Sequence, residues 1–218
     1  MKHIAFTSLA LIAVASAPAP AQLSAMSDAV PVRLAVRSDS KLWLEGSSNV
    51  RDWRCNATTL DASVDLDDAG AHASDPTAIA HLRHVQVRVP TRGLTCGRSQ
   101  MDNIMYRALH ADDEPDCRDI LGRFDVVSRS GRDHELVMQG TLRVAGQEHS
   151  VRLPIEVERL HDGTLRARGA LPILMTDYGI TPPTVFFGVL RTENRIIVKF
   201  DLLIDQPATL ASSAAGGQ

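Results

Sequence analysis

The sequence has little net charge and no long apolar run beyond its first residues. Its 23 lysines and arginines and 26 aspartates and glutamates give a formal net charge of −3 at pH 7. So weak a charge argues against a nucleic-acid partner and against an electrostatic grip on anionic membranes. The apolar stretch 171–190 is interrupted by Asp177, Pro182 and Pro183. We therefore expect no nucleic-acid partner and no integral membrane span.

The sequence also lacks the common catalytic and metal motifs. It has no G-x-S-x-G, H-E-x-x-H or C-x-x-C motif and no phosphate loop. His81 and His84 are three residues apart before a strand, and on a strand that spacing directs them to opposite faces. Cys117 has no obvious base nearby and is predicted to be a buried structural thiol. We predict no enzyme activity, catalytic residue, metal or cofactor.

The sequence has only three cysteines, and a predicted export signal indicates whether they can form a disulfide. Lys2 and His3 precede the apolar segment 4–15, and a small-x-small pattern ends at Ala21. This pattern predicts a signal peptide over residues 1–21, with cleavage after Ala21. The apolar segment is shorter than the about 20 residues that a membrane span needs, although an uncleaved anchor is the alternative. In an oxidising compartment the three cysteines predict one disulfide and one free thiol, and the residues leave the pairing open.

The remaining chain divides into one domain with loose ends. Residues 22–32 are predicted to be a loose lead-in. Residues 206–218, mostly Ala, Ser and Gly, are predicted to be a disordered tail. Residues 33–205 then form a single domain, long enough to bury a sizeable core.

Alternation with period two dominates this domain and predicts half-buried strands. Short turn signals lie at 68–70, 130–131, 145–146 and 162–163. Such a chain predicts an all-β, mainly antiparallel meander of about eight strands that closes into a barrel. The alternating segments are 41–45, 85–89, 135–144, 151–157, 165–173 and 195–204.

One segment has helical spacing instead. Its apolar residues are Met101, Ile104, Met105, Ala108 and Leu109. They predict a short amphipathic helix, one of at most two in the fold, that covers an end or flank of the barrel. Ser99 and Asp102 are expected to form a capping pair at its start. Ordinary core packing is the commoner role for methionines at this spacing.

The predicted inward faces mix large and small apolar residues. Gly140, Ala167 and Gly169 stand among leucines, valines and isoleucines. Small residues can leave room for an elongated apolar guest, or they can simply interdigitate with large neighbours. The residues themselves do not distinguish these two arrangements.

Four segments, in order, resemble the YceI-like proteins. Residues 40–55 resemble the first strand and turn of the family, in the variant with a G-x-S-x-x-x-x-W-x-C stretch. Residues 94–97, followed by Met101 and Met105, resemble the next signature of that variant. Residues 140–154 resemble the G-x-L-x-x-x-G strand and hairpin. Residues 175–180 and 198–202 are similar to the closing segment, so the resemblance covers residues 33–205.

The resemblance implies a lipocalin-like barrel in the periplasm that holds an isoprenoid lipid, including quinone-type molecules, along its axis. It implies a non-enzymatic carrier with a Cys55–Cys96 disulfide and a free Cys117. We expect a monomer or a homodimer. Because aromatic residues make up only 4% of the chain, the lining should be mainly aliphatic. The expected ligand-binding residues are Leu44, Met101, Met105, Met138, Leu142, Ile155, Ala167, Gly169, Phe186, Phe187 and Phe200.

Two other functions remain open from the residues. A barrel filled by its own side chains would be a secreted interaction module, and a closed-up interior would favour it. A hydrolase or other secreted enzyme would need polar groups to converge on one cleft. The candidates for that cleft are His110, Asp112, Asp113, Asp177 and Tyr178.

Overall fold

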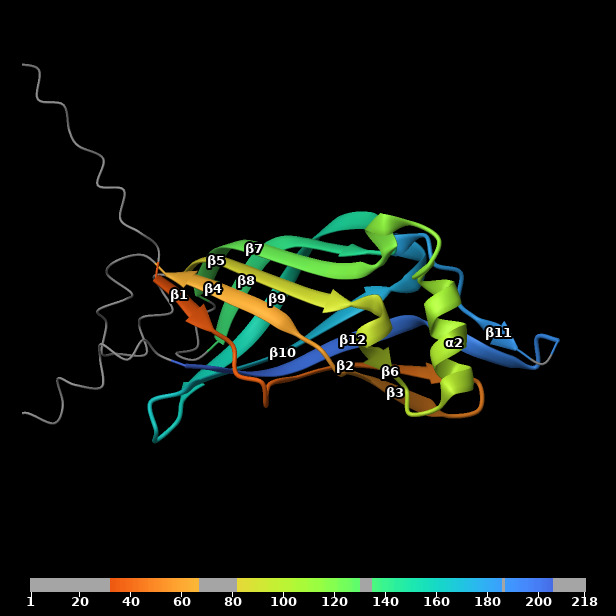
Figure 1. The fold of residues 1–218 in the computed structure, drawn as a ribbon, viewed down its shortest axis with the longest axis horizontal. Helices are drawn as coiled ribbons and strands as arrows, with labels where there is room; N and C mark the ends of the chain where they lie inside the picture. Colours follow the sequence, from red (N-terminus) through yellow and green to blue (C-terminus); the bar gives the residue numbers. More distant parts are fainter. Residues whose placement is uncertain (1–31, 67–81, 130–134, 186, 206–218) are drawn as a thin grey trace, which may run out of the picture.

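The computed structural model describes residues 32–66, 82–129, 135–185 and 187–205, which form an antiparallel β-barrel with one α-helix at one end (Figure 1). The helix is α2 (Ser99–Ala108), and three 3₁₀ turns span Thr91–Gly93, Pro115–Cys117 and Met175–Tyr178. The strands are β1 (Val32–Ala35), β2 (Lys41–Ser48), β3 (Asp52–Ala57), β4 (Asp61–Leu66), β5 (Leu82–Pro90), β6 (Leu94–Thr95), β7 (Asp119–Arg129), β8 (Glu135–Val144), β9 (Gln147–Arg159), β10 (Leu165–Leu174), β11 (Thr184–Val185) and β12 (Leu190–Ile204).

The barrel closes because its first strands are bent and pair with the last one. β12 pairs with β10 on one side and with β2 on the other, and Val36, just after β1, bridges Ile204 of β12. β1 pairs with β4, and β4 pairs in turn with β5. In the same way β2 pairs with β3, and β3 pairs in turn with β6. The barrel has eight strands when β1 and β2, β3 and β4, and β5 and β6 are each counted as one bent strand. The other five are β7, β8, β9, β10 and β12. The predicted barrel of about eight antiparallel strands is confirmed.

All six alternating segments lie in strands of the barrel, namely β2, β5, β8, β9, β10 and β12. The alternation did not mark β7, where Gly122 occupies an inward position and a bulge after Phe124 shifts the register against β8. Ala145 and Gly146 join β8 to β9 with φ angles of 47° and 76°, the left-handed conformation of a tight hairpin turn. The predicted turns at 68–70 and 130–131 lie outside the described residues.

The barrel interior is the hydrophobic core. Inward side chains of β8, β9 and β10 are buried, while their outward neighbours are mostly charged or polar and reach solvent. Because one face of each strand is buried and the other reaches solvent, apolar and polar residues alternate along its sequence. The predicted signal peptide, residues 22–31 of the lead-in and the tail 206–218 lie outside the described residues. Among the residues that are described, no helix combines the length and apolarity needed to cross a membrane.

Candidate functional site

A narrow apolar cavity of about 180 Å³ runs inside the barrel. Among the residues that the structure describes, no charged side chain lines it, and Tyr178 is the one lining residue with a polar side-chain group. Its size is comparable to the about 150 Å³ apolar cavity that accepts benzene in an engineered protein core. The inward alternation predicted many of its walls. The expected ligand-binding residues that line this lumen are Leu44, Met138, Leu142, Ile155, Ala167 and Phe200.

A second cavity of about 700 Å³ lies at the mouth of the barrel. Its walls come from α2, the β2–β3 hairpin and the segment that leads into β12, and they include the predicted Met101 and Met105. Leu44, Met175 and Ile196 line both cavities, so the lumen and the mouth adjoin each other. This mouth cavity falls within the about 300–1,000 Å³ typical of ligand pockets.

Two predicted small residues serve packing and do not open space. A Cβ on Gly169 would lie 2.5 Å from the Phe200 ring, so the ring packs directly over the glycine. A Cβ on Gly140 would lie 2.0 Å from the carbonyl oxygen of Arg123, beside the β7 bulge. Ala167, by contrast, lines the lumen. The small residues therefore have both roles that the sequence left open.

The predicted Phe187 does not line either cavity. Phe186 lies outside the described residues. Phe187 is fully exposed, with a φ of 56°, and lines neither cavity. It belongs to the loop before β12, where the nearby Val189 is also exposed.

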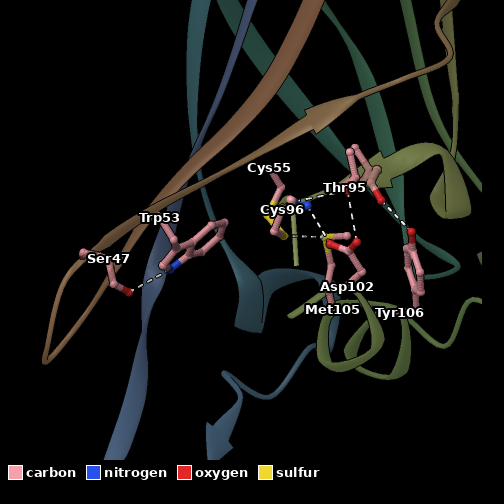
Figure 2. The surroundings of a disulfide bond; sticks show 10 residues. Ser47, Trp53, Cys55, Thr95, Cys96, Asp102, Met105 and Tyr106 are labelled. Atoms are coloured by element: carbon pink, nitrogen blue, oxygen red, sulfur yellow. Dashed lines mark hydrogen bonds between the residues drawn. A yellow bond between two sulfur atoms is a disulfide. The ribbon is translucent and has the colours of Figure 1, made fainter. Parts of the chain in front are cut away.

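The disulfide forms between Cys55 and Cys96 (Figure 2), as the resemblance implied. Both cysteines line the mouth cavity. Cys55 lies in β3 and is buried, and Cys96 follows β6 just before α2. The bridge therefore connects the segment that begins α2 to the barrel wall. Cys117 is a free and buried thiol, and its burial raises its pKa.

The start of α2 differs from the expected capping pair. The residue preceding the helix is Arg98, and no side chain caps the helix there. Asp102 instead accepts hydrogen bonds from the Cys96 backbone N–H at 2.6 Å and from Thr95 Oγ1 at 3.0 Å (Figure 2). Its carboxylate therefore fastens the helix to the end of strand β6 beside the disulfide.

The second half of α2 is held by Tyr106. Its hydroxyl donates to a backbone carbonyl oxygen (Figure 2), that of Leu94, at 2.6 Å. The Arg92 guanidinium lies 4.9 Å from the centre of its ring. Arg92 also pairs with Asp112, and its guanidinium lowers the pKa of that carboxyl. The helix is thus attached along one side, while Met101, Ile104 and Met105 line the mouth.

Trp53 forms part of the mouth wall and was missed as a site residue. Its ring packs on Gly46, where a Cβ would lie 2.2 Å from the indole, and its Nε1 donates to the Ser47 carbonyl oxygen at 3.2 Å (Figure 2). Gly46 and Trp53 are the glycine and the tryptophan of the G-x-S-x-x-x-x-W-x-C stretch. The motif could therefore have identified Trp53 as a site residue, whereas the alternation of apolar residues along the strands could not.

The rim of the mouth joins two loops that are far apart in sequence. The Asn49 side chain donates to the Val189 carbonyl oxygen at 2.8 Å and accepts from the Arg191 backbone N–H at 2.9 Å. One asparagine therefore ties the β2–β3 turn to the loop before β12. Val50 and Val189 are both exposed beside this junction.

The polar residues named for an enzyme do not converge. His110, Asp112 and Asp113 are exposed around the end of α2 and line neither cavity, and Asp177 is exposed elsewhere. Tyr178 is buried in the lumen wall, where burial raises its pKa. In the described part of the chain, no group of three or more His, Cys, Asp and Glu side chains is placed to hold a metal.

Solved structures with the same fold are known. BcnA from Burkholderia cenocepacia is 16% identical with a TM-score of 0.60, covering 75% of this chain and 95% of that one. A polyisoprenoid-binding domain from Saccharophagus degradans is 15% identical with a TM-score of 0.57, covering 80% and 98%. The YceI protein of Campylobacter jejuni is 17% identical with a TM-score of 0.51, covering 70% and 85%. No curated protein matches the chain.

The sequence itself matches the family model for the YceI-like domain over residues 29–203. This range contains the disulfide, α2, every described residue that lines the mouth, and every described residue that lines the lumen except Ile204. The chain belongs to the YceI-like domain family.

Proposed function

We propose that the protein is a non-enzymatic carrier that binds one elongated apolar ligand, an isoprenoid lipid or quinone, with its tail in the lumen. The observation that carries this proposal is a lumen whose described lining residues have no charged side chain, adjoining a larger mouth cavity. Burial of the tail would supply affinity at about 0.8 kcal/mol per CH₂ group removed from water. The relative from Saccharophagus degradans, described as a polyisoprenoid-binding domain, supports this ligand class.

The two cavities suggest how such a ligand would lie. The lumen would take a thin, flexible end of the tail, contacted by Met138, Leu142, Ile155 and Ala167. The mouth is several times larger and would hold the bulkier end beside α2 and Trp53. A barrel filled by its own side chains is disfavoured by cavities of these sizes.

We place the carrier in the periplasm. The basic and apolar N-terminal residues that predict a signal peptide support export. The disulfide between Cys55 and Cys96 suits an oxidising compartment. Fractionation of producing cells, with the mature N-terminus read by mass spectrometry, tests this; protein retained in the cytoplasm with residues 1–21 intact would refute it.

The ligand is tested by extracting lipid from the purified protein and analysing the extract by mass spectrometry. We expect one prenyl lipid per chain. The variant Ala167→Leu, which fills the lumen, should lose most of it. Ala170→Leu places the same side chain on the exposed face of the same strand and serves as the matched control. Protein that carries no lipid and binds no added prenyl lipid would overturn the proposal.

A further inference from the structure

Within the described part of the chain, the mouth cavity is lined by charge of one sign only. Arg51, in the β2–β3 turn, and Arg98, immediately before α2, both contribute to its lining, and no aspartate or glutamate does. The chain as a whole contains more acidic than basic residues. Two arginines without an acid therefore make this opening different from the average surface of the protein.

Neither guanidinium has a partner among the described residues. The side chains of Arg51 and Arg98 form no hydrogen bond or ion pair there, whereas Arg54 pairs with Glu45 and Arg92 pairs with Asp112. The two arginines of the mouth are thus available to a ligand.

The nearby acids are turned away or engaged elsewhere. Asp102 receives the hydrogen bonds of Cys96 and Thr95. Glu193 accepts a hydrogen bond from Ser47 Oγ at 2.7 Å. Asp52 precedes Trp53 on β3, so it faces away from the cavity that Trp53 lines. No acid of the described residues therefore forms an ion pair with Arg51 or Arg98.

The remaining walls are apolar and determine how a ligand would be oriented. Met101, Ile104 and Met105 line the mouth from α2, and no described residue that lines the lumen beyond has a charged side chain. A guanidinium presents a planar fork of N–H donors that matches a carboxylate or phosphate. An amphiphile with an anionic end would thus place its tail inward and its head between the arginines.

We propose that the mouth selects lipids with an anionic head, a phosphate or carboxylate, over neutral lipids with the same tail, through contacts of Arg51 and Arg98 with the head. This inference rests on the proposed function, since burial of the tail supplies most of the affinity. Contacts of the head with the arginines then select among lipids that have the same tail. It favours a prenyl phosphate or a prenyl acid over a quinone.

The test compares three ligands with one tail: geranylgeraniol, geranylgeranyl phosphate and geranylgeranoic acid. Binding to the oxidised protein is followed by the emission of Trp53, with Trp43→Phe as the background because Trp43 and Trp53 are the two tryptophans. We expect the phosphate or the acid to bind about tenfold more tightly than the alcohol at low salt. The preference should shrink at about 1 M salt, where charges are screened.

Paired variants assign the effect to the mouth. In Arg51→Gln/Arg98→Gln the affinity for the anionic ligands should fall about tenfold more than the affinity for the alcohol. Arg107→Gln removes an equal charge from the exposed face of the same helix and should retain the preference. Circular dichroism and denaturation verify that each variant folds.

The outcomes separate this inference from the proposed function. Equal binding of alcohol, phosphate and acid to the unsubstituted protein would overturn the inference and leave the lipid carrier standing. A preference that survives in the double variant, or that Arg107→Gln abolishes equally, would also overturn it. No binding of any of the three ligands would overturn both.

Discussion

Gly46 is required by the tryptophan that lies on it. A Cβ at this position would come within 2.2–2.8 Å of three atoms of the Trp53 ring. Gly46→Ala should therefore displace the ring, destabilise the fold by about 1–3 kcal/mol and shift the tryptophan emission. Chemical denaturation followed by fluorescence measures both effects. Gly93→Ala is the control, since its Cβ would meet only ordinary contacts of 3.6 Å or more; equal losses in the two variants would contradict this account.

Glu45 lies on the outer face of β2 at the centre of a polar cluster. Hydrogen bonds from Lys199, Trp43 and Arg54 lower its pKa from 4.5 to about 2. A carboxyl with a lowered pKa stabilises the fold above its unfolded pKa, and this contribution is lost as the pH falls from about 4.5 through 2. Glu45→Gln should therefore cost about 1 kcal/mol at pH 7, allowing for solvent screening, and much less near pH 2.

The measurement is urea denaturation of both proteins across that pH range. Glu148→Gln serves as the control because Glu148 is exposed and forms no ion pair in the described part of the chain. A difference between Glu45→Gln and the original protein that stays constant from pH 7 to pH 2 would contradict the assignment.

At the scale of elements, the disulfide holds the junction between β3, β6 and α2. Its cysteines are 41 residues apart, so the bridge should contribute about 4 kcal/mol in the chain-entropy model. Cys55→Ala/Cys96→Ala should lower the midpoint of thermal unfolding and weaken ligand binding at the mouth. A reductant should have the same effect on the original protein and none on the double variant. Unchanged stability after complete reduction would contradict this role.

The sequence predicted those elements whose pattern is local. Six alternating segments became strands, and the apolar spacing 101–109 became α2, because burial of one face leaves a periodic trace. The bulged β7 and the short β3 and β4 left a weaker trace. Helix α2 begins at Ser99, but the capping pair expected of Ser99 and Asp102 was wrong. The Asp102 carboxylate accepts hydrogen bonds from Thr95 and Cys96 instead, and the end of strand β6 approaches it only in the folded chain.

At the scale of the whole molecule, the sequence predicts only some of the residues that line the site. Alternation identified lumen residues such as Met138 and Leu142, because one face of each strand must point inward. Met175 and Ile180 lie in and just after a 3₁₀ turn, and Trp53 lies on a strand that alternation did not mark. Closure of the barrel, through pairing of β12 with β2, brings these residues to the mouth. That pairing joins the two ends of the domain and has no local signature.

The central claim, that lumen and mouth form one site for an elongated lipid, is tested most directly by a series of prenyl alcohols that differ only in length. The affinity should rise with each added isoprene unit, at no more than about 0.8 kcal/mol per CH₂ group, until the lumen is full and then level off. In Ala167→Leu the rise should stop at a shorter tail, whereas Ala170→Leu should follow the original protein. Affinities that do not depend on tail length, or that respond equally to the two variants, would contradict the claim.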